Sequence, residues 1–304
     1  MKKLLSITSC AALCLLAAAS CEKNEFNGDL LPEKKQNIIF APAMESIGTR
    51  AMSEVTQVQN FKVSAIYYKE QTLQTYFENQ TTTASGEYQS VGNYYWPDWN
   101  LSFYAVYPPV DMTINGGGVT VPVGTSDKKL TGNEDYVCAL SESVAKNTLP
   151  VKLKFSHILA NVAGVKFTTS YAGTGTTVAI NELKISFPKY GKYNLVTKNW
   201  NSLGTAESTN LPYPETMSGN DTGSAVADIS VIPGTYTVSI KYTVSYNGTA
   251  VQMNKSASVT LPAGKKSTLV ASFKDSDDLK NIQFNVELTP WDTSDLNVSF
   301  TPVS

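Results

Sequence analysis

Residues 235–246 read TYTVSIKYTVSY and show the clearest alternation in the chain. Every second position is apolar or aromatic, namely Tyr236, Val238, Ile240, Tyr242, Val244 and Tyr246. A period of two over this length, rich in β-branched and aromatic residues, is typical of a half-buried β-strand. Asn247-Gly248 follows directly, and this pair is the one most typical of a two-residue hairpin turn. The stretch therefore predicts an antiparallel β-hairpin.

The same period of two recurs along most of the chain, in residues 61–67, 151–155, 257–261, 269–273 and 282–288. No window has a convincing helical period longer than about three turns, although residues 141–147 could hold one short helix. The sequence predicts an all-β protein made of two tandem antiparallel β-sandwich domains. We expect the boundary between them near the GTGTT segment, residues 173–177.

The first 21 residues have the features of an export signal. Lys2 and Lys3 precede an apolar run over residues 4–19, and the segment ends in Ala-Ala-Ser-Cys at residues 18–21. This order is typical of a secretory signal peptide, and the run is shorter than the roughly 20 apolar residues that a membrane span needs. The final cysteine resembles a bacterial lipobox, in which Cys21 becomes the first mature residue and carries the lipid. A plain secreted protein with a chance cysteine is the alternative.

Composition excludes several kinds of function. Removal of residues 1–20 takes away two of the 24 basic residues and none of the 26 acidic ones, so the mature chain is mildly acidic. Arg50 is the only arginine, which argues against nucleic-acid binding because arginine is the best bidentate phosphate ligand. Beyond Cys21, Cys138 is the one cysteine left, so neither an internal disulfide nor a CxxC zinc site can form. We expect Cys138 to be a buried, unreactive side chain.

Motifs for catalysis and metal binding are weak. His157 is the only histidine, so any histidine-based triad must use it. Two S-x-x-K matches, at residues 126–129 and 143–146, lack the accompanying SDN and KTG motifs. Residues 275–278 (DSDD) resemble the start of a calcium loop but are not followed by its glycine and glutamate. The sequence predicts no enzyme, no metal and no cofactor; an anchored hydrolase acting through His157 is a third alternative.

Residues 94–99 (YYWPDW) and 103–107 (FYAVY) form an aromatic cluster. Exposed Trp96 and Trp99 could form a stacking platform for a glycan, because apolar ring faces cover the C–H faces of sugars. In a β-sandwich, alternating aromatic residues more commonly fill the core. The sequence leaves both interpretations open.

The same cluster carries a resemblance to a known family. Residues 95–97 (YWP) and 101–108 (LSFYAVYP) resemble the N-terminal domain of the Bacteroidetes fimbrillin-like lipoproteins, the subunits of type V pili. Residues 49–51 (TRA), 155–157 (FSH) and 289–291 (TPW) also fit in order and spacing. The resemblance covers most of the chain. It implies two transthyretin-like sandwich domains and identifies Cys21 as the site of lipid attachment, including palmitate.

The resemblance also implies a way of assembly. An Arg- or Lys-specific protease cuts after the first strand, and a strand from the next subunit fills the groove that the lost strand leaves. Here the removable strand would be residues 37–41, with Ile38 and Phe40 pointing inward. The cut would fall between Arg50 and Ala51. The donated strand could be residues 296–301, with Leu296, Val298 and Phe300 as anchors, or these residues could form the last strand of their own domain.

These expectations divide the chain into four parts: a lipoprotein signal peptide (residues 1–20), a tether with the removable first strand (21–50), an N-terminal β-sandwich domain (51–172) and a C-terminal one (173–304). The predicted function is a structural subunit of a surface fimbria at the cell outer membrane. Its partners would be other fimbrial subunits, the outer membrane through the Cys21 lipid, and a host surface or glycan, with no nucleic acid. The alternative is a surface lipoprotein adhesin that binds glycan or host protein without polymerising.

Overall fold

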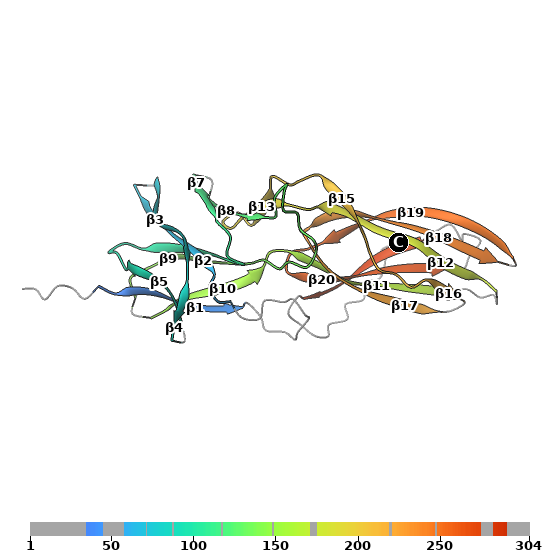
Figure 1. The fold of residues 1–304 in the computed structure, drawn as a ribbon, viewed down its shortest axis with the longest axis horizontal. Coiled ribbons are helices and arrows are strands. Elements are labelled where there is room, and N and C mark those ends of the chain that lie inside the picture. Colours follow the sequence, from blue (N-terminus) through green and yellow to red (C-terminus); the bar gives the residue numbers. More distant parts are fainter. Residues whose placement is uncertain are drawn as a thin grey trace, which may run out of the picture. The chain divides into compact units, whose positions relative to one another are not determined.

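The computed structural model describes most of the chain as β-strands (Figure 1). The described residues are 35–44, 58–70, 72–86, 88–116, 118–147, 149–170, 175–218, 221–246, 248–274 and 282–290. Within them no helix is long and apolar enough to cross a lipid bilayer. The all-β prediction is confirmed.

The strands of the first half are β1 (Asn37–Met44), β2 (Lys62–Lys69), β3 (Thr72–Thr81), β4 (Thr83–Ser85), β5 (Tyr88–Tyr95), β6 (Leu101–Tyr107), β7 (Thr113–Asn115), β8 (Gly118–Val123), β9 (Val137–Val144) and β10 (Val151–His157). The second half contains β11 (Ala160–Ser170), β12 (Thr177–Pro188), β13 (Gly191–Asn194), β14 (Asn199–Asn201), β15 (Ala206–Asn210), β16 (Thr216–Ser218), β17 (Thr222–Val231), β18 (Gly234–Tyr246), β19 (Thr249–Leu261), β20 (Lys265–Lys274) and β21 (Ile282–Pro290).

The hairpin predicted from residues 235–248 is present. Strands β18 and β19 pair antiparallel without interruption, from Gly234 opposite Leu261 to Tyr246 opposite Thr249. Gly248 has a φ of 80°, a left-handed conformation that glycine adopts without steric cost. The turn position and the alternating pattern therefore both predict the observed register of β18 and β19.

The short helix considered for residues 141–147 was wrong. Residues 141–144 belong to β9, where Val144 lies opposite Leu101 and Ser141 opposite Phe103 of β6. Pairing with β6 decides the conformation here, because a weak local preference is readily overridden by tertiary contacts.

The first half of the chain forms an eight-stranded sheet in the order β3-β2-β6-β9-β10-β1-β5-β4. β9 and β10 lie between β6 and β1 in this order. The ring centroids of Phe40 on β1 and Phe103 on β6 are nevertheless only 5.3 Å apart. The sheet must therefore fold over so that its two ends face each other as the layers of a sandwich. The buried aromatic and aliphatic side chains of both layers form one hydrophobic cluster between them.

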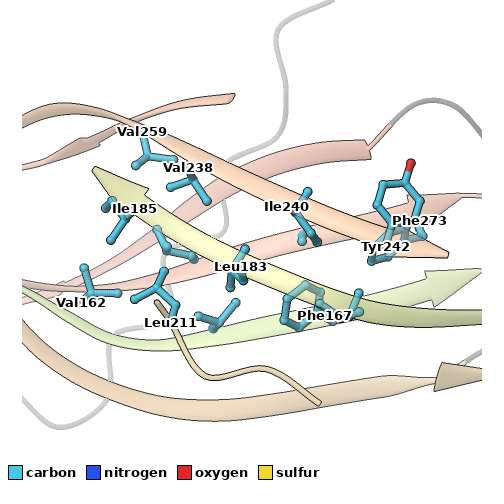
Figure 2. Close-up of a cluster of buried hydrophobic side chains, with 14 of the residues drawn as sticks. Val162, Phe167, Leu183, Ile185, Leu211, Val238, Ile240, Tyr242, Val259 and Phe273 are labelled. Atoms are coloured by element: carbon cyan, nitrogen blue, oxygen red, sulfur yellow. The ribbon is translucent and has the colours of Figure 1, made fainter. Parts of the chain in front are cut away.

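The second half has two facing sheets. One has the order β17-β11-β20-β21, and the other contains β15-β12-β18-β19 with β16 beside β12. Side chains from both sheets meet in a second hydrophobic cluster, which includes Phe167, Leu183, Ile240 and Phe273 (Figure 2). This arrangement is a β-sandwich whose core alternates with the outward-facing polar positions of each strand.

A smaller sheet, β14-β13-β8-β7, joins segments that are far apart in the sequence. Gly191 of β13 lies opposite Val123 of β8, so residues on both sides of the expected 172/173 boundary share this sheet. A third hydrophobic cluster lies beside it and draws on both segments, from Ile66 to Ile232. The described residues from Gln36 onward belong to one compact unit, and the division into domains 51–172 and 173–304 stays a prediction.

Tyr242 tests how much an unpaired buried hydroxyl destabilises the second core. Its side chain is fully buried, and its hydroxyl has no hydrogen-bond partner among the described residues (Figure 2). We expect Tyr242→Phe to raise the free energy of unfolding by about 1–2 kcal/mol, because an unpaired buried hydroxyl costs about 1–3 kcal/mol. Urea unfolding would measure the change.

The matched control is Tyr236→Phe on the same strand, because the Tyr236 hydroxyl donates a hydrogen bond to the carbonyl of Ile232. We expect this variant to lose about 0.5–1.5 kcal/mol. Equal losses in the two variants would contradict the assignment of Tyr242 as an unsatisfied group.

Candidate functional site

Strand β1 lies between β10 and β5 and divides its length between them (Figure 1). Its first half pairs antiparallel with β5, with Ile39 opposite Ser90 and Phe40 opposite Gln89. Its second half pairs parallel with β10, from Phe40 opposite Val151 to Met44 opposite Phe155. β1 thus joins two parts of the sheet that do not pair with each other.

Two side chains hold β1 in place. Ile38 and Phe40 are completely buried. Asn37, the first residue of the strand, is exposed, and Ile39 is half-buried. This pattern follows from the alternation of the segment NIIFAPAM, since alternate residues of a strand point to opposite faces. Burial of two such side chains contributes about 3–6 kcal/mol.

The pocket that receives Phe40 is aromatic. The centroid of its ring lies 5.3 Å from that of Phe103 and 6.1 Å from that of Phe61. The interplanar angles are 80° and 74°, so both pairs are T-shaped. Phe61 in turn contacts Phe155 at 5.2 Å. Such T-shaped pairs add about 0.5–1.5 kcal/mol each beyond the area that they bury.

The second half of β1 is held less well. Pro42, opposite Leu153, has no N–H to donate to a neighbouring strand. Ala41 and Ala43 on either side have small side chains, and Met44 is only partly buried against the cluster. Parallel pairing is also slightly less stable per residue than antiparallel pairing. The hold on β1 is therefore concentrated at Ile38 and Phe40.

The structure separates the two tryptophans that the sequence left together. Trp96 is 6% exposed, and its ring packs edge-on at 5.7 Å against Phe103 in the core. Trp99 is 47% exposed and lies 5.1 Å from the ring of Tyr67. The glycan hypothesis for this pair consequently rests on Trp99, with Tyr67 as a neighbour that sequence reasoning did not identify.

His157 lies at the end of β10, and its Nδ1 is 2.9 Å from Oδ1 of Asp135. Both side chains are buried, an arrangement that orients the imidazole and satisfies the carboxylate inside the protein. Asp135 is separated from His157 by 22 residues, so spacing alone gave no signal for this pair.

Cys138 on β9 is buried, and burial raises the pKa of its thiol well above the ordinary range. A thiol in this state reacts poorly, because the thiolate is the nucleophilic form. Within the described ranges no group of three or more His, Cys, Asp or Glu side chains could hold a metal ion.

Several residues singled out in the sequence lie outside the described residues. They are the lipidation site Cys21, the cleavage pair Arg50 and Ala51, the calcium-like segment 275–278, and the donor candidates Leu296, Val298 and Phe300. Their roles remain predictions.

Comparison with known proteins gives one family and several similar structures. The fimbrillin-like family model matches residues 49–291. A fimbrial protein from Bacteroides vulgatus is similar with a TM-score of 0.57 and 15% sequence identity, over 84% of this chain and 100% of that one. At this identity the likeness shows the fold alone.

Two proteins named for cell adhesion are also similar. The one from Bacteroides ovatus has a TM-score of 0.48 and 15% identity, over 86% of this chain and 99% of that chain. The one from Bacteroides eggerthii has a TM-score of 0.40 and 11% identity, over 84% of this chain and 97% of that chain. No curated protein sequence matches the chain.

The different burial of the two tryptophans makes a direct test. We expect Trp96→Ala to lower the free energy of unfolding by about 3–5 kcal/mol, because it leaves a cavity in the core. Trp99→Ala should cost about 1 kcal/mol or less, as exposed positions generally do. Losses of similar size in urea unfolding would contradict the placement of Trp96 in the core and Trp99 at the surface.

A second pair of variants tests the hold on β1. Phe40→Ala should cost about 3–5 kcal/mol, whereas the half-buried neighbour Ile39→Ala should cost about 1 kcal/mol. Because β1 joins β5 to β10, Phe40→Ala should also speed hydrogen exchange at the amides of β5, read by mass spectrometry. If hydrogen exchange in β5 is unchanged in Phe40→Ala while it is faster elsewhere, pairing with β1 is not what protects the β5 amides.

Proposed function

The chain belongs to the fimbrillin-like family, and on that premise we propose that it is a structural, non-enzymatic subunit of a cell-surface fimbria. Family membership makes it a fimbrial or adhesion-related surface protein. The finer proposal is assembly by exchange of a β-strand between subunits. The observation that carries it is the position of β1, an eight-residue strand with two buried anchors between β10 and β5.

Export and anchoring come first in this proposal. The signal segment directs the chain out of the cytoplasm, and a lipid on Cys21 holds it at the outer membrane. Cys21 precedes β1 in the sequence, so the lipid is attached to the same segment that β1 would leave with. The lipid then acts as a delivery handle for a processed subunit, or as a permanent anchor for an unprocessed one.

Cleavage after Arg50 is the proposed trigger. Arg50 lies six positions after Met44, the last residue of β1, and before β2 begins at Lys62. As the only arginine, it gives an Arg-specific protease a single place to act. A cut there turns β1 from a covalently linked strand into a separate peptide. Its effective concentration then falls from the intramolecular, roughly millimolar, range to that of free peptide.

The incoming strand has to meet the requirements that β1 meets. It would run parallel to β10 and antiparallel to β5, as β1 does, and place apolar side chains two residues apart in the Ile38 and Phe40 pockets. Leu296, Val298 and Phe300 have this spacing. We propose that these residues of one subunit fill the groove of the next.

Limited proteolysis tests the proposal. Residues 22–304 treated with an Arg-specific protease should give a chain that begins at Ala51, identified by mass spectrometry, and this chain should form polymers visible by light scattering and electron microscopy. The control Arg50→Gln should stay intact and monomeric, and Phe300→Asp should be cut without polymerising.

A cut chain that stays monomeric under all conditions would overturn assembly by strand exchange. It would favour the surface adhesin instead. Polymerisation of the cut Phe300→Asp chain would exclude residues 296–301 as the donated strand while leaving β1 as the strand that is replaced.

A further inference from the structure

A groove lies between the outer face of the eight-stranded sheet and the turn that joins β13 to β14. Val137 and Ala139 of β9 belong to the first hydrophobic cluster, whereas Cys138 between them belongs to the third. Cys138 therefore points to the opposite face of the sheet, and Ser156 of β10 lies opposite it in the ladder. This face and the turn form an open cavity of about 350 Å³, whose lining includes Leu140, Glu142, Lys154, Ser156, Tyr193 and Lys198. We call it the β9–β13 groove.

The turn on one side of the groove is held in place by hydrogen bonds. The side-chain oxygen of Asn194 accepts hydrogen bonds of 2.9 Å from the N–H groups of residues 196 and 197. The N–H of Leu195 donates a further one, also 2.9 Å long, to the carbonyl of Val119 on β8. Lys198, the last residue before β14, is therefore carried by a well-anchored turn. The groove is preformed, as sites for small molecules usually are.

The groove carries charges of both signs. Lys154, Lys198 and Glu142 line it, and all three are exposed residues. Two ammonium groups and one carboxylate leave an excess of one positive charge, which favours a ligand with a single negative charge. Glu142 would repel a phosphate group, whose charge is about −1.5 to −2, but its carboxylate accepts hydrogen bonds from neutral hydroxyls. The charged side chains therefore fit a ligand that has one carboxylate and several hydroxyl groups.

Tyrosine side chains add hydrogen-bonding groups and ring faces. Burial raises the pKa of Tyr193 to about 12, so its hydroxyl keeps its proton and can donate as well as accept. Tyr104 on β6 lies opposite Leu140, next to the groove. Burial raises the pKa of Tyr104 to about 12 as well, and the nearby Tyr68 and Glu142 raise it further. Aromatic rings beside such polar groups can cover the apolar C–H faces of a sugar.

A pyranose ring that bears one carboxylate matches these features. Its carboxylate can form charge-assisted hydrogen bonds with a lysine ammonium group, and its hydroxyls can bond to Glu142, Ser156 and Tyr193. The volume of the groove is near the lower end of the range of small-molecule sites, about 300–1,000 Å³, so it suits one or two sugar residues. From this lining and the anchored turn, we propose that the β9–β13 groove binds a sugar acid, either free or at the end of a glycan.

The inference goes beyond fimbrial assembly and does not depend on it. Ile38 and Phe40 of β1 lie in the first hydrophobic cluster, on the other face of the sheet from Cys138. None of the residues that line the groove comes from β1, so replacement of β1 would leave the lining in place. Trp99 does not line the groove either, which makes this a different site from the glycan contact considered there.

Nuclear magnetic resonance on residues 22–304 tests the groove. Methyl glucuronide and the methyl glycoside of N-acetylneuraminic acid are titrated, each beside its own carboxylate methyl ester, which keeps the ring and removes the charge. We expect at least one of the acids to shift the amide signals of residues 138–142 and 193–198. Its ester should bind about tenfold more weakly, the loss typical of one hydrogen bond to a charged group.

A pair of lysine variants identifies the group that holds the carboxylate. Lys198→Gln should weaken binding of the acid about tenfold and change binding of the ester about twofold or less. The matched control is Lys192→Gln, at an exposed lysine of β13 next to Tyr193. Its side chain points to the opposite face from Tyr193, so this variant should bind the acid as the unchanged protein does.

Three results would overturn the site: neither acid shifts these amides, acid and ester bind equally, or Lys198→Gln binds the acid as Lys192→Gln does. Shifts confined to the Trp99 indole would place sugar binding there instead and would also exclude the groove. The outcome is separate from that of assembly. A chain that polymerises after cleavage without binding either acid loses the groove and keeps the fimbrial proposal, and the reverse result does the opposite.

Discussion

A strand inside a β-sheet has to pair along both of its edges, and the N-terminal half of this protein depends on β1 doing so. β1 meets the requirement with two partners in succession, β5 for its first half and β10 for its second. Neither ladder runs the full length of the strand. The burial of Ile38 and Phe40 has to supply what the short ladders do not, and it also closes the hydrophobic cluster around Phe61 and Phe103.

In the C-terminal half the strands pair over longer stretches. β18 and β19 each have 13 residues and pair over their whole length across a tight turn, and β12 continues the pairing on the other side of β18. The β18–β19 ladder joins strands that are consecutive in the sequence, whereas five other strands lie between β12 and β18 along the chain. No residue before Ala160 contributes to this core among the described residues. Ile38 and Phe40 belong to the first hydrophobic cluster and not to this one, so a change at β1 removes contacts from the first cluster directly.

Features encoded by local patterns could be predicted from the sequence, whereas pairings between distant segments could not. The 235–248 hairpin was predictable because alternation and turn residues are local and agree, and the family resemblance from residues 95–108 was confirmed by the match over residues 49–291. The pairing of β13 with β8 was not predictable, because it joins segments about 70 residues apart and no local pattern encodes it. Trp96 and Trp99 could not be told apart, since both lie in a short irregular segment around Pro97 where no period assigns a face. The Asp135 and His157 pair was missed for the same reason as the β13 pairing.

The features that hold β1 in the sheet are also the ones that the proposed strand exchange requires. Its anchors are two apolar side chains at a spacing that any β-strand can reproduce, and Pro42 withholds a backbone donor that another strand would supply. A competing strand can thus match or exceed the contacts of β1. What β1 has in its favour is its covalent connection, which keeps its effective concentration high while a competitor must be brought from another molecule. In the proposed strand exchange, the balance between a closed subunit and an open one would be set by the integrity of the chain after Met44 more than by the contacts that β1 makes. Under that proposal, breaking a single bond would shift the balance, because the intramolecular advantage of a linked strand is lost when the link is cut.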